Sequence, residues 1–205
     1  MKFDYLIVGT GLAGLMLCET LRKRGKSFKV VSNTSQQASI VASGLYNPVV
    51  LKRFNKAWNA NTQLPLALSA YKDLEKFLRI KVDHQLPIYR VFHAVEEQNN
   101  WFLACDKPDL QPFLIPKVIN NDNTNINAPF GFGEVRQTGR VDTKLLLESY
   151  VSSLKSMGLY LEETFNYKAL DLHMGVNYKG FFAKQLIFAE GFGSVSYTHL
   201  RAHET

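Results

Sequence analysis

The chain has 205 residues, enough for one sizeable core or for two small ones. Its composition, 46% hydrophobic and 20% charged residues, is typical of a globular protein, and no apolar run is long enough to cross a membrane. The formal net charge of +6 comes from scattered basic residues, which favours surface solvation over a nucleic-acid-binding stripe. Cys18 and Cys105 lie far apart and make no disulfide framework, so we expect a reducing, cytoplasmic compartment.

The first 31 residues predict a strand, a glycine turn, an amphipathic helix and a second strand. The apolar runs Leu6–Val8 and Phe28–Val31 are the two strands, and the turn has the spacing GxGxxG at Gly9, Gly11 and Gly14. This layout is typical of the βαβ unit that binds a dinucleotide. A glycine-rich turn that binds nothing is the alternative.

Each glycine of the turn has a separate physical role in such a unit. Gly9 lets the chain turn sharply out of the strand, Gly11 lets a pyrophosphate approach the backbone, and Gly14 lets the helix pack closely on the strand. The first N–H groups of the helix and its dipole then face the phosphates.

The second strand ends without the acidic side chain that usually accepts the ribose hydroxyls in dinucleotide-binding folds. Ser32 and Asn33 stand there instead, and the amide oxygen of Asn33 can accept a hydrogen bond from a ribose. The missing charge weakens the case for NAD in particular.

Hydrophobic periodicity and turn residues predict the elements that follow. In chain order they are first a helix from about residue 65 to 78, a strand over 86–94, a short helix over 96–105, a polar loop over 120–127 and a strand over 133–136. A helix follows, with Asp142 or Thr143 as its N-terminal cap and Gly158 as its stop. The last elements are a strand over 159–163, a hairpin of 170–176 with 181–184, and an apolar strand over 186–189.

The last eleven residues, Val195–Thr205, resemble the translation of a transposase-type sequencing-library adapter over their whole length. We therefore expect this tail to be foreign to the protein and to take no part in its fold. His199 and His203 have the i, i+4 spacing of paired metal ligands, but they fall inside this tail. The sequence predicts no metal site.

Four elements, in this order, resemble the FAD-dependent oxidoreductases typified by D-amino-acid oxidase and glycine oxidase. They are the turn Gly9–Gly14, the small-residue segment Ala42–Pro48, the helix start Gly139–Asp142 and the late strand Leu186–Gly191. In this family a segment like Ala42–Pro48 follows the second strand and wraps the cofactor beside the isoalloxazine ring. The chain departs from the family at Glu190, where a small residue is usual.

The resemblance implies an α/β fold: a discontinuous Rossmann-like FAD-binding domain with the start of an antiparallel-sheet substrate domain. It places residues 1–80 and 135–194 in the cofactor domain and residues 81–134 in the substrate domain, and it covers about the first half of a family member. It implies the cofactor FAD, although the missing acid leaves the strength of FAD binding open. The cofactor-binding residues that it implies are Gly9, Thr10, Gly11, Leu12, Ala13, Gly14, Ser32, Asn33, Ser43, Gly44 and Gly191.

The activity implied by the resemblance is oxidation of the C–H next to an amine, in an amino acid or related small-molecule amine, by hydride transfer to the flavin. An Arg usually binds the substrate carboxylate in such enzymes, and Arg53 and Arg90 are the candidates, each with a solvated surface arginine as its alternative. His84 and His93 are expected at strand edges rather than as catalytic bases, and no catalytic residue is predicted.

Two other functions stay open at this point. One is a flavoprotein that oxidises an amine on modified tRNA, which the basic balance mildly favours. The other is a nucleotide-binding module without redox activity. The truncated chain by itself is expected to be inactive, and its exposed sheet edges would favour aggregation.

Overall fold

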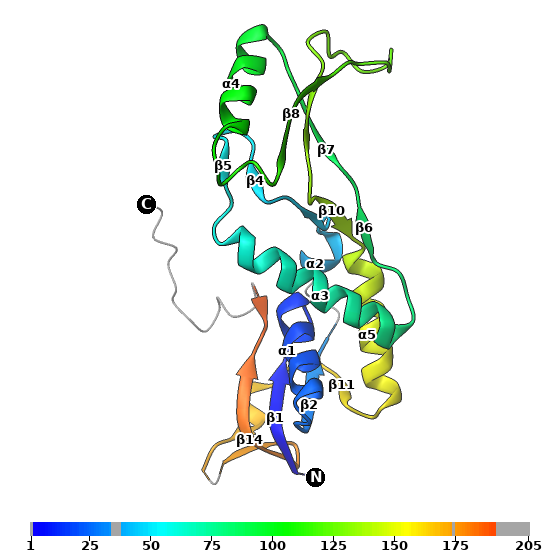
Figure 1. Ribbon diagram of the computed structural model, residues 1–205. Helices are drawn as coiled ribbons and strands as arrows, with labels where there is room; N and C mark the ends of the chain where they lie inside the picture. The colour runs from blue at the N-terminus through cyan, green and yellow to red at the C-terminus, as the bar shows by residue number, and fades with distance from the viewer. Residues whose placement is uncertain (1, 34–37, 174, 192–205) are drawn as a thin grey trace. The chain divides into compact units, whose positions relative to one another are not determined.

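The computed structural model describes residues 2–33, 38–173 and 175–191 (Figure 1). Its contacts divide the chain into two compact units. The discontinuous unit comprises the described residues of 1–42 and 143–205, and the inserted unit comprises residues 43–142. The predicted assignment of residues 1–80 and 135–194 to cofactor and of 81–134 to substrate stays a prediction. The adapter-like tail and its two histidines lie outside the described residues.

The discontinuous unit is built on a six-stranded sheet in the order β11-β2-β1-β14-β13-β12. The first four strands run parallel, and β14, β13 and β12 pair antiparallel. Figure 1 shows β1, β2 and β14 side by side. The bounds are β1 Lys2–Val8, β2 Phe28–Ser32, β11 Tyr160–Glu162, β12 Leu170–Asp171, β13 Val176–Tyr178 and β14 Phe181–Phe188.

Three α-helices and a short 3-10 helix accompany this sheet: α1 Leu12–Lys23, α2 Ala38–Val41, α5 Thr143–Ser156 and η1 Tyr167–Ala169. Helix α1 ends at Lys23, two residues before Gly25, whose φ of +64° is left-handed, and α5 ends at Ser156, before the predicted stop Gly158. The buried side of α5 is formed by Leu146, Leu147 and Leu154 together with Tyr150. β1, the glycine turn, α1 and β2 together confirm the strand–turn–helix–strand unit predicted over the first 31 residues.

The C-terminal hairpin differs from the prediction. Strand β14 runs without a break through the two predicted strands 181–184 and 186–189, and it pairs with β1 from Phe182 to Phe188. The hairpin turn lies at Lys179 and Gly180, both with positive φ. The polar residues Lys184 and Gln185 predict a break, but the strand continues through their exposed side chains because β1 stays paired with it there, beyond the end of the pairing with β13 at Ala183.

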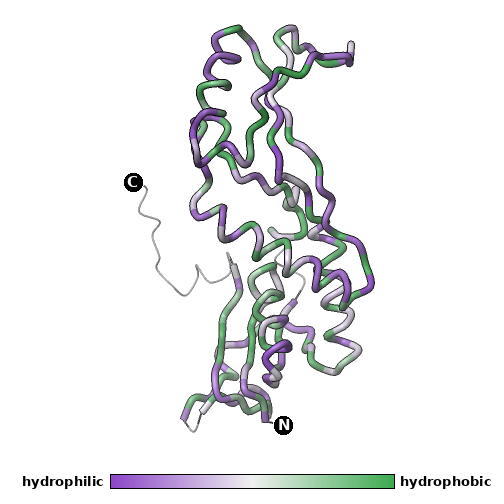
Figure 2. The backbone as a smooth tube through the Cα atoms, viewed as in Figure 1, coloured by the Kyte–Doolittle hydropathy of each residue, from purple (hydrophilic) through white to green (hydrophobic). Residues whose placement is uncertain are grey.

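The inserted unit contains short antiparallel sheets and two helices. Its sheets are β3-β10-β6, β4-β5 and β7-β9-β8. The bounds are β3 Leu45–Tyr46, β4 Val49–Val50, β5 Asn55–Lys56, α3 Ala60–Leu78, β6 Asp83–Gln85, β7 Ile88–Val91, α4 Val95–Cys105, β8 Leu114–Ile119, β9 Phe132–Val135 and β10 Gly139–Val141. The hydrophilic loop between β8 and β9 is the predicted polar loop over 120–127 (Figure 2).

Two predicted elements of this unit are corrected. Helix α3 begins at Ala60 rather than near residue 65, because Asn59 adopts a left-handed φ of 51° and its carbonyl accepts from Gln63 N, leaving Pro65 inside the helix. The predicted strand over 86–94 is shorter: β7 covers only Ile88–Val91 and follows the separate strand β6. Pro87 lies between them and has no N–H for a sheet ladder.

Trp101 of α4 lies at the centre of the inserted unit's core. Its side chain is fully buried, and Nε1 donates to the carbonyl of Ile115 at 2.8 Å. The indole lies so close to Gly133 of β9 that a Cβ there would be 2.6 Å from the ring. Phe92, Leu110 and other apolar side chains surround it. The helix is thereby fixed on the sheet β7-β9-β8.

Candidate cofactor-binding site

Two glycines of the N-terminal turn are required by the chain itself. Gly9 has a φ of +101°, and a Cβ on it would overlap the carbonyl oxygen of Ala189 at the end of β14. A Cβ on Gly14 would overlap the carbonyl oxygen of Gly9. The backbone therefore leaves β1 and enters α1 with no room for side chains at these two positions.

Gly11 differs from these two glycines. It is the N-cap of α1 with a φ of −66°, and a Cβ on it would have only ordinary contact, at 3.4 Å, with Ser39 Oγ. The described residues thus leave space beside the Gly11 backbone. Gly11 has no side chain of its own to cap the helix, and the first turn of α1 has no acidic residue. Such a helix N-terminus favours an anion, and the open glycine lets a diphosphate come close to the backbone.

Ser39 is a neighbour of this helix start that the sequence did not reveal. Leu12 is the first residue of α1, and its N–H donates to Ser39 Oγ at 3.3 Å. The next residue, Ala13, is exposed. Ser39 follows in a polar stretch without periodicity, far along the chain, so no spacing rule pointed to it. Its hydroxyl adds a polar group where phosphates would lie.

At the carboxyl end of β2 the two predicted residues have different surroundings. Ser32 is buried, and its hydroxyl accepts from Thr10 Oγ1 at 3.0 Å, which ties the strand end to the glycine turn. The amide of Asn33 donates from Nδ2 to Thr164 Oγ1 at 2.8 Å. That bond assigns the nitrogen side of the amide to Thr164 and leaves the acceptor chemistry of a ribose contact to the oxygen.

An acidic residue, Glu163, lies beside this strand end on the chain leaving β11. Its N–H donates to the carbonyl of Ser32 at 3.1 Å. The ammonium of Lys179 and the phenol of Tyr178 both donate to its carboxylate and hold the pKa of Glu163 below its usual value. Each carboxylate oxygen of Glu163 thus already accepts a hydrogen bond within the discontinuous unit.

Glu190, the unusual residue of the late strand, has a structural role. Its carboxylate accepts a hydrogen bond from the phenol of Tyr167 in η1. The Tyr167 ring stacks on Phe188, with centroids 5.7 Å apart. Glu190 therefore joins the end of β14 to the segment that crosses from β11. The next residue, Gly191, has a left-handed φ of +56°.

The segment Ala42–Pro48 contributes its predicted residues from the inserted unit. Gly44 has a φ of +72°, and a Cβ on it would overlap the carbonyl oxygen of Val141 in β10. Ser43 presents its carbonyl to Arg140 Nε at 3.1 Å. Pairing of β3 with β10 thus already explains a glycine at 44. A flavin contact of Ser43 and Gly44 stays a prediction.

The predicted site residues therefore fall in two places. The discontinuous unit brings the glycine turn and the end of β2 together at the carboxyl ends of its parallel strands, where Gly191 also follows β14. Ser43, Gly44, Arg53 and Arg90 lie in the inserted unit.

The two candidate substrate arginines also have different environments. Arg53 is exposed in the turn between β4 and β5. Arg90 of β7 is largely covered: Nη1 donates to the carbonyl of Leu51 at 3.1 Å and Nη2 lies 3.6 Å from a carboxylate oxygen of Glu97. A substrate role for either residue stays a prediction.

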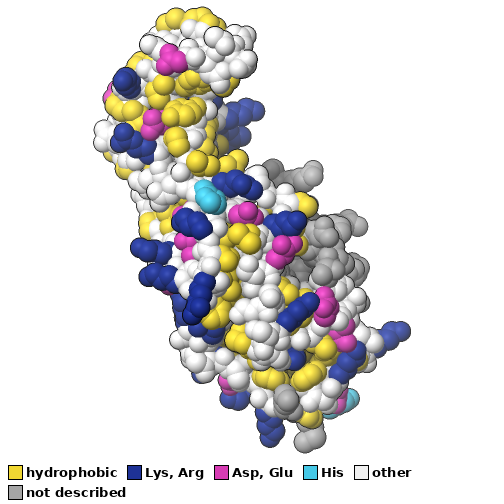
Figure 3. All heavy atoms as spheres, turned by 90° about the vertical axis from the view of Figure 1, so that its right-hand side faces the viewer, with side chains coloured by type: hydrophobic (Ala, Val, Ile, Leu, Met, Phe, Trp, Pro, Cys, Tyr) yellow, Lys and Arg dark blue, Asp and Glu magenta, His cyan; other side chains and the backbone are white. Residues whose placement is uncertain are grey.

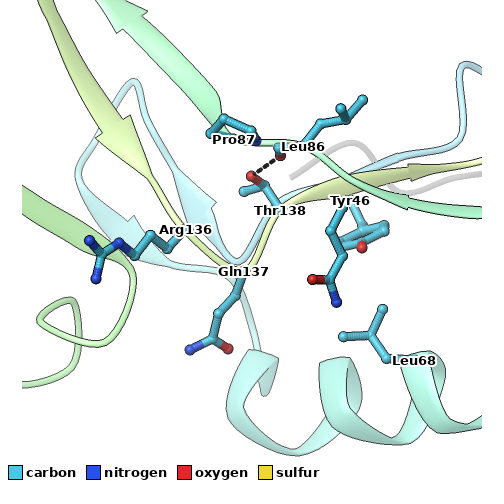
Figure 4. Close-up of a pocket in the computed structure, with 8 residues that line it drawn as sticks. Tyr46, Leu68, Leu86, Pro87, Arg136, Gln137 and Thr138 are labelled. Atoms are coloured by element: carbon cyan, nitrogen blue, oxygen red, sulfur yellow. Dashed lines mark hydrogen bonds between the residues drawn. The ribbon is translucent and has the colours of Figure 1, made fainter. Parts of the chain in front are cut away.

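A cavity of about 390 Å³ lies within the inserted unit beside Tyr46 (Figure 4). Its walls are mostly apolar, with two amides among them: Tyr46, Leu68, Gln85, Leu86, Pro87, Arg136, Gln137 and Thr138. Thr138 Oγ1 donates to the carbonyl of Leu86 at 2.6 Å, and the Tyr46 phenol donates to Asp83 at 2.9 Å. In Figure 4 the Arg136 side chain points away from Tyr46 and Leu68. The chemistry of these walls suits a small apolar group with hydrogen-bonding ends.

The histidines and possible metal ligands add nothing to this site. His84 lies on β6 and His93 follows β7, and both side chains are exposed. Among the described residues no three His, Cys, Asp or Glu side chains are grouped so as to hold a metal ion. None of the described helices is both long and apolar enough to span a membrane.

The segment that contains the glycine turn matches a known protein family. Residues 4–61 match the FAD binding domain family, which confirms the prediction of FAD as the cofactor. Glycine oxidase from Bacillus cereus ATCC 14579 has a similar structure, with a TM-score of 0.62 and 19% identity over 92% of this chain and 55% of that one. L-amino acid deaminase from Proteus vulgaris gives a TM-score of 0.63 and 17% identity, over 92% and 47%.

Iminodiacetate oxidase from Chelativorans sp. BNC1 is also similar, with a TM-score of 0.62 and 14% identity over 90% of this chain and 54% of that one. The chain thus spans about half the length of the solved structures that it matches. Residues 4–61 match that family and the chain shares the α/β fold of these structures, which confirms the predicted fold class and the resemblance to glycine oxidase.

Proposed function

We propose that the whole protein is a FAD-dependent oxidoreductase that oxidises the C–H next to an amine, in an amino acid or related amine. The observation that carries this proposal is the turn Gly9–Gly14 in the segment that matches the FAD binding domain family. There the chain itself requires glycine at 9 and 14, and it leaves the backbone of Gly11 open at the start of α1. The similar folds of amino-acid oxidising enzymes support the substrate class.

The residues of this chain would bind and orient, while bound FAD supplies the hydride acceptor. The N-terminus of α1, with Gly11, would hold the diphosphate, and Asn33 would accept from the ribose. Ser43 and Gly44 would approach the flavin. Arg53 would bind the substrate carboxylate, because a guanidinium makes two parallel hydrogen bonds with it.

The test is to express the complete gene and to record the absorbance of the purified protein. We expect a yellow protein whose flavin band bleaches without oxygen when the correct amine is added. A panel of D-, L- and N-substituted amino acids would then identify the substrate. A folded protein that never takes up FAD would refute the proposal, and one that takes up FAD but bleaches with no amine would indicate a module without redox activity.

A second candidate substrate is an amine on modified tRNA, which the net charge of +6 favours. The basic side chains do not form one stripe on the face that Figure 3 shows; they are interspersed with acidic ones. Binding of tRNA that weakens steeply with salt would distinguish this substrate from a free amino acid. Bleaching by a free amino acid with no tRNA binding would remove it.

A further inference from the structure

The turn that carries Arg53 contains a strained residue. Phe54 follows Arg53 between β4 and β5 and has a φ of +46°. Bulky side chains rarely adopt this left-handed region, and a residue held there is strained. The surroundings of Phe54 must therefore fix this conformation.

Three groups of the inserted unit hold Phe54. Its ring packs edge-on against the buried Trp101, with centroids 5.9 Å apart and planes at 75°. The guanidinium carbon of Arg90 lies 5.0 Å from the centre of the same ring. Lys107 Nζ donates to the Phe54 carbonyl at 3.4 Å. The strained turn is thus anchored to the core of α4 and the sheet β7-β9-β8.

Arg90 contacts this turn at a second point. Its Nη1 donates to the carbonyl of Leu51, two residues before Arg53, at 3.1 Å. Its Nη2 lies 3.6 Å from Glu97 Oε1, and Glu97 Oε2 in turn accepts from the N–H of His93 at 3.0 Å. Nε of Arg90 is buried with no hydrogen-bond partner among the described residues. The pose of the guanidinium is therefore set by Leu51, Phe54 and Glu97, even though one donor is left unmet.

We propose that Arg90 is a positioning residue: it clamps the turn Leu51–Phe54 from both ends, so that the exposed Arg53 presents its guanidinium to the substrate carboxylate. Arg90 acts through Phe54 and Leu51, and it does not touch the substrate. This inference rests on the proposed function only for the role of Arg53. The clamp itself is a property of the inserted unit.

Limited proteolysis of the full-length protein tests the clamp without reference to activity. Trypsin cleaves after Lys52 and Arg53, and mass spectrometry reports cleavage at these two bonds separately from all others. We expect Arg90→Ala to raise the cleavage rate there about tenfold, since a hydrogen bond to Leu51 and a cation–π contact are lost together. Arg90→Lys should also raise the cleavage rate, because an ammonium cannot contact ring, carbonyl and carboxylate at once. The rise should be smaller than for Arg90→Ala, because lysine keeps the positive charge. Lys117→Ala, which removes an exposed cation from β8 of the same sheet, is the control.

Steady-state kinetics of Arg53→Ala, Arg90→Ala and the double variant test the positioning role. We expect Arg90→Ala to raise KM about tenfold with little change in kcat, and to add no further rise in the Arg53→Ala background. Equal effects in both backgrounds would mean that Arg90 binds the substrate directly, and would overturn the inference.

The outcomes separate the clamp from the proposed function. Unchanged trypsin cleavage in both Arg90 variants, each with a wild-type melting temperature, would overturn the clamp. If Arg90→Ala fails to fold, Arg90→Lys carries the same comparisons. Raised cleavage together with an Arg53→Ala variant of normal KM would refute the carboxylate role of Arg53 and leave the clamp standing.

Discussion

Gly14 packs directly on Gly9: a Cβ added to Gly14 would overlap the Gly9 carbonyl oxygen. This contact joins the first turn of α1 to the end of β1 and lies entirely within the chain. We expect Gly14→Ala to lower the free energy of unfolding by about 1–3 kcal/mol, since backbone must move to admit the methyl group. Urea denaturation of the full-length apoprotein measures the change.

Gly11→Ala is the matched variant, since its methyl group meets only Ser39 Oγ at 3.4 Å. We expect it to fold with nearly wild-type stability and to bind FAD about tenfold or more weakly, because the methyl group occupies the approach of the diphosphate. Titration of apoprotein with FAD, followed by flavin fluorescence, gives the affinity. Wild-type affinity in Gly11→Ala would place the diphosphate elsewhere.

Asn33 is the expected ribose partner in place of the missing acid. Its amide nitrogen is bound to Thr164 Oγ1, so the oxygen carries the acceptor role. We predict that Asn33→Ala weakens FAD binding about tenfold, the scale of one hydrogen bond, while Asn33→Asp, which keeps an acceptor oxygen, preserves binding. Titration of the Asn33→Ala and Asn33→Asp apoproteins with FAD gives the two affinities to compare. Equal affinities in wild type and Asn33→Ala would mean that the ribose is bound by another residue.

The strand–turn–helix–strand segment of the first 31 residues could be predicted because its signals are local. The spacing of Gly9, Gly11 and Gly14 and the two flanking apolar runs fix a strand–turn–helix–strand order by sterics alone. Pairings between distant segments have no such signature. Strand β14 continues past Lys184 because β1 lies beside it, and Ser39 reaches the start of α1 from a stretch without periodicity. The position of these groups follows from the packed sheet and not from any spacing in the chain.

Glu190 is a further case in which only the fold supplies the reason for a residue. Because the Tyr167 phenol donates to its carboxylate, we predict that Tyr167→Phe destabilises the protein by about 1 kcal/mol. Glu190→Ala, which removes the acceptor, should cost a similar amount, and the double variant should cost little more than either single one. A double-mutant cycle from urea denaturation measures this coupling. Strict additivity would show that the two side chains do not interact in solution.

The carboxylate of Asp4 joins three strands and makes their stability depend on pH. Lys184 Nζ of β14 donates to Oδ1 at 2.7 Å, and the N–H and hydroxyl of Ser27, just before β2, donate to Oδ2 at 2.9 and 2.8 Å. The ammonium of Lys184, followed by the two Ser27 donors, holds the pKa of Asp4 well below its ordinary value. These bonds require the ionised carboxylate, so folding and ionisation are linked.

Since the pKa is lowered in the folded state, the stabilisation is complete above the unfolded-state pKa of about 3.9 and is lost as the pH falls toward the folded-state value. We therefore predict that Asp4→Asn lowers the urea midpoint at pH 7 and that the difference from wild type shrinks as the pH falls below about 4. Asp122→Asn, in the exposed loop between β8 and β9, is the control and should leave the urea midpoint unchanged at pH 7 and at pH 3. A midpoint difference for Asp4→Asn that stays constant from pH 7 to pH 3 would mean that side-chain shape, and not ionisation, stabilises this junction.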